Sequence, residues 1–159
     1  MVSRIRRIAL GLLLPVVFAG AAHAQGHPPY RPHIGAHLSY NFKAEEFGIG
    51  PQFYIPVAHR FEVYPSFDYY FVDNGSLWQL NGDLKFKGRE EHSWWYLGAG
   101  LAVSRASFGG FHNTDVGANV LGGLETLIGQ KIHPYFEARL TFRDNTVFQL
   151  AGGLNITIY

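Results

Sequence analysis

The sequence has 159 residues, no cysteine, and a formal net charge of +1. The lack of cysteine excludes a disulfide framework, and the charged residues form no basic patch that would indicate nucleic-acid binding. The length suits one domain, and a 16% share of aromatic residues with 19 glycines and one methionine favours an all-β fold.

The first 24 residues have the features of a cleaved secretory signal peptide. Three arginines between positions 4 and 7 precede an apolar run at 8–22, and Ala-His-Ala at 22–24 is a small-residue cleavage site. The apolar run is short for a membrane-spanning helix. Removing residues 1–24 leaves 135 residues with a formal net charge of −2.

A proline-rich, extended lead-in is expected at residues 25–33, followed by one β-barrel domain at 34–159. Eight segments of this domain alternate apolar and polar residues, which is typical of half-buried strands. They cover residues 34–42, 47–57, 61–71, 78–87, 94–104, 116–125, 133–143 and 148–159. Because the connections between them are short, we expect antiparallel neighbours.

The segment 133–143 separates most clearly into two faces. Its apolar row is Pro134, Phe136, Ala138, Leu140 and Phe142, and its polar row is His133, Tyr135, Glu137, Arg139, Thr141 and Arg143. Two architectures share this alternation. The apolar row points inward in a soluble barrel, and outward to lipid in an outer-membrane barrel.

The size of the barrel favours the lipid-facing arrangement. An eight-stranded barrel has an interior just wide enough for side chains to fill. The apolar rows contain Phe42, Phe47, Phe53, Phe61, Phe67, Tyr69, Phe71, Trp78, Phe86, Trp95, Phe136, Phe142 and Phe148. These rings would overfill such an interior, whereas the polar rows, rich in glycine, serine and asparagine, would fit. Strands of about nine to eleven residues also match the hydrocarbon thickness of a bilayer.

Aromatic residues gather near the predicted strand ends, which is the distribution of the aromatic girdles of membrane barrels. The predicted girdle consists of Tyr40, Phe42, Tyr69, Phe71, Trp78, Phe142 and Phe148 at one rim, and of Phe61, Phe86, Trp95 and Tyr159 at the other.

In this architecture the chain resembles the small eight-stranded outer-membrane barrels of the OmpA/OmpX type. The resemblance covers residues 34–159. It rests on this architecture, on the signal peptide and on the terminal aromatic residue Tyr159. It implies a location in the outer membrane of a diderm bacterium, contact with outer-membrane lipid, insertion by the barrel-assembly machinery and a monomeric state. One feature departs from the family pattern, because Tyr159 has the opposite parity to the last apolar row.

The inward rows carry a limited set of charged residues. They are Glu62, Asp68, Asp83, Lys85, Lys87, Glu125, Glu137, Arg139 and Arg143. Because buried charges must be paired, we interpret them as a polar network that fills the lumen of a structural or surface-interaction protein without catalytic activity. The alternatives are a narrow channel for small solutes or ions and a lipid-modifying enzyme.

The histidines show no spacing typical of metal ligands. His37 and His133 fall in the inward rows, where a lone histidine is more often hydrogen-bonded filler than a ligand. We therefore expect no metal, no cofactor and no catalytic residue.

The connection at residues 105–115 is the longest that the sequence predicts. With both chain ends in the periplasm, it is expected on the extracellular side, together with the connections at 43–46, 73–76 and 144–146. Loops often carry binding functions, so Phe108 and Phe111 are possible contacts for a partner. An ordinary glycine-rich loop is the simpler interpretation.

Overall fold

The computed structural model describes residues 31–90, 93–128 and 131–158. The predicted signal peptide, most of the predicted lead-in and Tyr159 lie outside the described residues. The strands are β1 (His33–Asn41), β2 (Glu46–Ala58), β3 (Phe61–Tyr70), β4 (Gly75–Glu90), β5 (Ser93–Phe108), β6 (Phe111–Thr126), β7 (Ile132–Phe142) and β8 (Val147–Thr157). In these residues no helix is long and apolar enough to cross a membrane.

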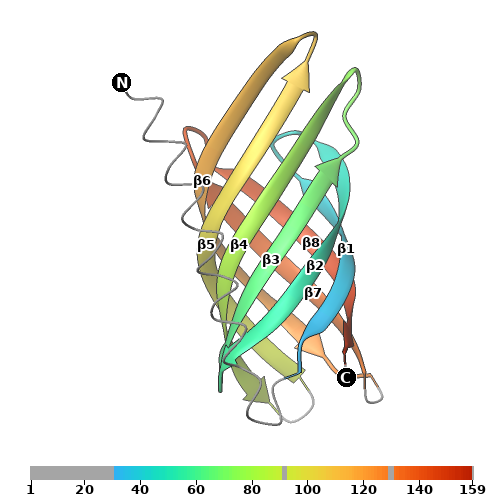
Figure 1. The fold of residues 1–159 in the computed structure, drawn as a ribbon, viewed down its shortest axis with the longest axis vertical. Helices are drawn as coiled ribbons and strands as arrows, with labels where there is room; N and C mark the ends of the chain where they lie inside the picture. Colours follow the sequence, from blue (N-terminus) through green and yellow to red (C-terminus); the bar gives the residue numbers. More distant parts are fainter. Residues whose placement is uncertain (1–30, 91–92, 129–130, 159) are drawn as a thin grey trace.

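The eight strands form a closed barrel. Each strand pairs antiparallel with the next, and β1 pairs with β8 to complete the sheet, as Figure 1 shows. His33 and Thr157 are paired at the end where the chain finishes, which we call the termini end. The opposite end carries the turn between β5 and β6, and we call it the hairpin end.

Alternation along the strands places polar side chains inside the barrel and apolar ones outside. In β1, His37 and Ser39 are 4% and 2% exposed, whereas Leu38 between them is 62% exposed. In β7, Glu137 is 2% exposed and Phe136 is 55% exposed. The predicted fold, an antiparallel barrel with a polar, side-chain-filled lumen, is confirmed.

Inward-facing glycines make room where the wall lies close to other groups. A Cβ atom on Gly50 of β2 would collide with the backbone carbonyl of Phe67 in β3. On the outer face the constraint disappears, since a Cβ atom on Gly82 would meet no atom within 4 Å.

The predicted long loop at residues 105–115 is wrong. β5 continues to Phe108 and β6 begins at Phe111, and these two residues are paired. Only Gly109 and Gly110 form the turn, with φ angles of 55° and 86°. A two-residue hairpin turn needs positive φ at its central positions, which glycine adopts without strain.

Strands β4, β5 and β6 are longer than predicted, at 16 residues each. β6 pairs with β7 only from Ala118 onward, opposite Phe142, so the β5–β6 hairpin extends beyond the β7 wall. Figure 1 shows this hairpin rising above the rest of the barrel.

Some local features near the strand ends also differ from the prediction. Arg143 follows the last residue of β7 instead of lying inside the strand. The register between β2 and β3 shifts between Pro56 and Ala58. A proline removes a ladder hydrogen bond, and here the register continues past Pro51 and Pro65 without a shift.

Candidate functional site

The middle of the lumen contains a buried group of opposite charges on β4 and β7. Lys85 Nζ lies 2.6 Å from Glu137 Oε2, and Tyr96 donates its hydroxyl hydrogen to the same oxygen at 3.0 Å. Arg139 Nη2 lies 3.0 Å from Glu137 Oε1 and 2.9 Å from Asp83 Oδ2. All five residues are at most 3% exposed, so these charges are compensated by one another and not by water.

Aromatic rings surround the Lys85 ammonium group. Its Nζ atom lies 3.3 Å from the centre of the Tyr64 ring, 4.1 Å from that of Tyr96 and 4.7 Å from that of Tyr54. The Tyr135 ring follows at 5.8 Å. A cation over aromatic faces is stabilised by the ring quadrupoles, most strongly where water is excluded. These tyrosines were placed in the polar rows by their parity, but the sequence did not identify them as a cage.

A second group surrounds Asp68 nearer the hairpin end. Ser39 donates to its Oδ1 atom at 2.7 Å and Gln149 at 2.9 Å, and His37 Nε2 lies 2.8 Å from the same oxygen. Asn81 donates to Oδ2 at 3.1 Å. A carboxylate accepts about four hydrogen bonds, so Asp68 is well satisfied although it is only 1% exposed.

A third group lies at the termini end of the lumen. Lys87 Nζ lies 2.9 Å from Glu62 Oε2 and 3.2 Å from Glu125 Oε2. His133 Nδ1 lies 3.2 Å from Glu125 Oε1, and the His33 and His133 rings are stacked with their centres 4.4 Å apart. The sequence indicated the neighbourhood of Glu62 and Lys87, because β3 and β4 are consecutive. It did not indicate that two histidines from other strands join them.

Several contacts cross the lumen between strands that are not neighbours in the sheet. The Lys85–Glu137 pair joins β4 to β7, and Tyr135 of β7 donates to Gln52 Oε1 of β2 at 2.6 Å. Each of these pairs spans strands three places apart around the barrel. The three groups and these bridges form what we call the lumen network. Its side chains occupy the bore.

Arg143 lies apart from the lumen network, at the hairpin end. Its Nη1 atom donates to Ser104 Oγ and lies 3.9 Å from Asp115 Oδ2. The Asp115 side chain is 40% exposed, so this pair is in contact with water.

Aromatic rings on the outer face lie near both ends of the barrel. At the termini end, the Phe86 ring lies 5.4 Å from that of Phe61 and 5.9 Å from that of Trp95. Contacts nearer the hairpin end join Tyr40 to Phe42 and Phe47, Phe42 to Phe148, Tyr69 to Phe71, and Phe67 to Trp78. Phe142 is 47% exposed. The assignment of these rings to membrane girdles stays a prediction.

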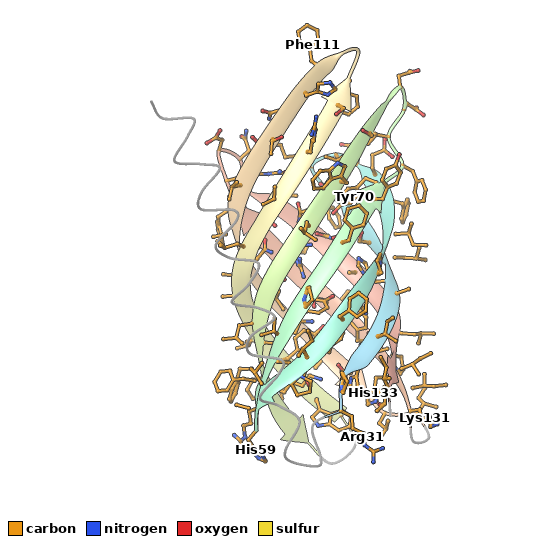
Figure 2. The ribbon with its side chains drawn as sticks, in the orientation of Figure 1. Arg31, His59, Tyr70, Phe111, Lys131 and His133 are labelled. Carbon is orange, nitrogen blue, oxygen red and sulfur yellow. The ribbon has the colours of Figure 1, made fainter. Side chains whose placement is uncertain are left out.

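The two phenylalanines predicted as loop contacts lie at the tip of the β5–β6 hairpin. Phe111 is 84% exposed and Phe108 is 44% exposed. Figure 2 shows Phe111 at the far hairpin end, opposite His59 and His133. They are held by a two-residue turn, and not by the long loop that the sequence suggested.

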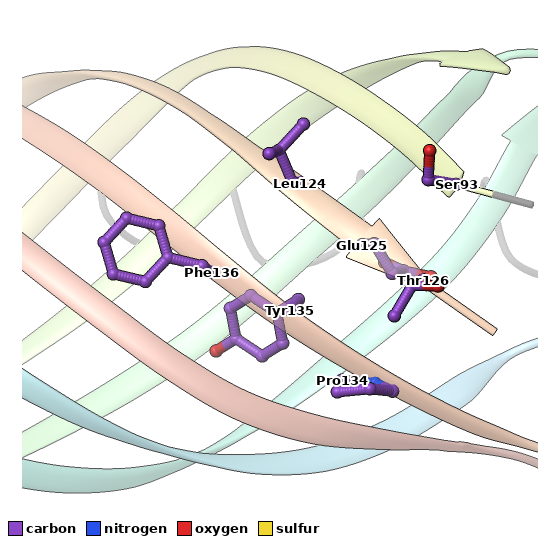
Figure 3. Close-up of a pocket in the computed structure, with 7 residues that line it drawn as sticks. All are labelled: Ser93, Leu124, Glu125, Thr126, Pro134, Tyr135 and Phe136. Atoms are coloured by element: carbon purple, nitrogen blue, oxygen red, sulfur yellow. The ribbon is translucent and has the colours of Figure 1, made fainter. Parts of the chain in front are cut away.

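An open hollow lies on the wall between β6 and β7 near the termini end (Figure 3). Its lining residues are Ser93, Leu124, Glu125, Thr126, Pro134, Tyr135 and Phe136. Leu124, Pro134 and Phe136 give it an apolar surface. Among these seven residues, a serine and a glutamate are present without a histidine, so the lining does not contain a serine hydrolase triad.

Comparison with solved structures identifies barrels of the same fold. The N-terminal β-barrel domain of Pseudomonas aeruginosa OprF matches with a TM-score of 0.68 at 15% identity, covering 81% of this chain and 98% of that chain. Ail of Yersinia pestis matches with a TM-score of 0.60 at 15% identity, covering 80% and 97%. Neisserial surface protein A matches with a TM-score of 0.59 at 14% identity, covering 81% and 97%.

No family model matches the sequence, and neither does any curated protein. The similarity to solved structures shows that the chain has the fold of the small eight-stranded outer-membrane barrels, as its resemblance to this class predicted. At these low identities the likeness extends to the fold alone.

Proposed function

We propose that this chain is a bacterial outer-membrane barrel with a filled lumen and a structural or surface-interaction role, without catalytic activity. One observation carries this proposal: charged and polar side chains bridge the lumen between strands on opposite sides of the barrel. The central Lys85–Glu137 pair is at most 2% exposed, so these charged groups contact each other and not water, as expected of a filled lumen.

The outer face supports the membrane location. Leu38, Leu97 and Phe136 are 62%, 60% and 55% exposed, and such large apolar side chains are stabilised by lipid and not by water. Among the described side chains of the eight strands, the outward positions carry one charged residue, Arg105 of β5, which lies opposite Thr114 and beyond the part of β6 that pairs with β7. Barrel closure also removes sheet edges, whose unpaired backbone groups lipid does not satisfy.

The β5–β6 hairpin is the part suited to contact with other molecules. In the proposed orientation the termini end faces the periplasm and the hairpin projects outside the cell. Phe111 at its tip supplies an exposed ring for a partner. We further propose that the barrel is monomeric, contacts outer-membrane lipid and reaches the membrane through the barrel-assembly machinery.

The membrane location is tested by folding the mature chain in buffer and, separately, in detergent micelles. We expect a β-type circular dichroism spectrum and a heat-dependent shift on an SDS gel only in detergent. A folded, monodisperse protein in plain buffer would contradict the proposal.

The filled lumen is tested by single-channel recording in planar bilayers. We expect no resolved current steps from the unmodified protein. Reproducible steps that disappear in Glu137→Gln but persist in the control Asp115→Asn would establish a channel instead. Lipid A incubated with the folded protein should keep its mass, since any new or lost acyl chain would establish an enzyme.

A further inference from the structure

Three groups with metal-ligating atoms converge at the termini end of the lumen. His33 from β1, Glu125 from β6 and His133 from β7 each offer one such atom, and these atoms all lie within 4.8 Å of one another. Glu125 is 2% exposed and His133 is 7% exposed, so both are held inside the barrel. Figure 2 shows His133 at the termini end.

Hydrogen bonding accounts for only part of this convergence. The Nδ1 atom of His133 is paired with Glu125 Oε1 at 3.2 Å. Within the described part of the chain, the Nδ1 atom of His33 is buried and has no hydrogen-bond partner. Buried polar atoms are normally paired, so the unpaired His33 nitrogen beside the His133–Glu125 pair calls for a ligand.

The other nitrogen of His133 is already fixed. Its Nε2 atom lies 3.0 Å from Thr157 Oγ1 on β8. Metal-binding histidines commonly hold their second nitrogen in such a hydrogen bond, which sets the tautomer and the ring orientation. With a proton on Nε2, the Nδ1 atom presents its lone pair toward Glu125.

We propose that His33, Glu125 and His133 bind one divalent transition-metal ion of the Zn²⁺ type, leaving a fourth position open. Imidazole nitrogens suit zinc, copper and nickel, whereas magnesium and calcium prefer oxygen ligands. In a tetrahedral zinc site with bonds of about 2.0–2.1 Å, ligand atoms are roughly 3.3 Å apart. Glu125 and His133 meet this spacing. The ligand atom of His33, at the first position of β1, lies within 4.8 Å of the other two, and a bound ion would draw this half-buried ring closer.

Lys87 is the competing cation at this site. Its Nζ atom lies 3.2 Å from Glu125 Oε2, so a metal ion has to share that carboxylate with an ammonium group. The same ammonium lies 2.9 Å from Glu62 Oε2 and keeps this partner when Glu125 turns toward the metal.

A metal at this position would connect strands that the sheet joins only through other strands. β1 and β7 both flank β8, the strand that closes the barrel. A bound ion would thus link the two neighbours of β8 and also β6. Because it binds only the closed barrel, it should raise the resistance of the barrel to thermal unfolding.

The test uses the mature chain folded in detergent and titrated with Zn²⁺, with binding followed by calorimetry. Trp94, whose ring centre lies 6.1 Å from that of His133, serves as a fluorescent reporter of binding by Co²⁺. We expect one ion per chain, and a loss in affinity of at least tenfold in His33→Ala, Glu125→Gln and His133→Gln. Thr157→Val should bind about 10- to 100-fold more weakly, because it loses the orienting contact.

Control variants remove histidines outside the site: His59→Ala and His112→Ala. They should bind Zn²⁺ like the unmodified protein. A heat-modifiability gel identifies which variants are folded. Zinc should also raise the temperature at which the folded band is lost, in the unmodified protein and the controls only. Unchanged affinity in folded His33→Ala, or an equal loss in the controls, would overturn the proposal.

Discussion

Neutralising Glu137 should destabilise the barrel more than neutralising a carboxylate at its water-exposed end. Glu137 interacts with Lys85 at 2.6 Å and with Tyr96 and Arg139 at 3.0 Å each. In Glu137→Gln the buried Lys85 loses its anion and keeps the Tyr54 hydroxyl at 3.3 Å and its aromatic neighbours. Removing one partner of a buried pair costs about 3–5 kcal/mol of folding free energy. Arg139 keeps Asp83, so the cost should lie at the lower end of this range.

The matched control is Asp115→Asn, which removes one carboxylate charge at a distance of 3.9 Å from Arg143. Because Asp115 is 40% exposed, its loss should cost about 0.2–1 kcal/mol. Both variants are compared by urea unfolding in lipid vesicles, followed by tryptophan fluorescence. Equal costs for the two variants would refute the view that the lumen network stabilises the fold. Lys85→Met with Glu137→Leu should recover much of the loss, since an apolar pair leaves no unpaired charge.

Four further substitutions test the two faces and the hairpin. Gly50→Val should prevent folding, as judged by a heat-modifiability gel, because its side chain would enter the space of the Phe67 carbonyl. Gly82→Ala faces open space and should change stability by no more than about 1 kcal/mol. Val120→Arg places a charge on the outer face near mid-strand and should cost about 2–4 kcal/mol in vesicle-based urea unfolding, so an effect below 1 kcal/mol would contradict lipid contact there. Phe111→Ala at the exposed tip should change stability by no more than about 0.5 kcal/mol. It should weaken the binding of any surface partner to the folded protein. A large loss of stability would show instead that this ring supports the fold.

The sequence predicted the faces of the strands because alternation is a local property. A residue two positions along a strand returns to the same face, so the parity of Glu137 follows directly from that of His133. In the structure the members of the predicted charged set lie on the inner side of their strands, except Arg143, which lies just past the end of β7.

The hairpin at residues 105–115 was not predicted, because a pair of glycines occurs both in open loops and in tight hairpin turns. Gly109 and Gly110 were interpreted as part of an ordinary glycine-rich loop, whereas their positive φ angles form a two-residue turn between paired strands. The segment that begins with Arg105 and Ser107 is mostly polar, so the hydrophobic pattern did not indicate that the strand continues.

Contacts inside the lumen were predictable only between consecutive strands. Glu62 and Lys87 lie on β3 and β4, which a short turn joins, and their proximity followed from the order of the chain. His33, Glu125 and His133 come from β1, β6 and β7, and they meet only after the barrel has closed. The two histidines have no motif spacing in the sequence, because the proposed ligands come from three separate strands and not from one helix or loop.

The lumen network also limits the functions that this barrel could gain through a few substitutions. A continuous bore requires removing side chains that bridge it, and the Lys85–Glu137 and Tyr135–Gln52 contacts are among the few that connect opposite walls. The outer face is apolar and contributes little cohesion in lipid, because the surrounding chains are as apolar as the side chains. Stability inside the membrane therefore depends on the interior. Widening the bore by truncating these residues should weaken the barrel at the same time, so conductance and resistance to unfolding are expected to change in opposite directions across a series of lumen variants.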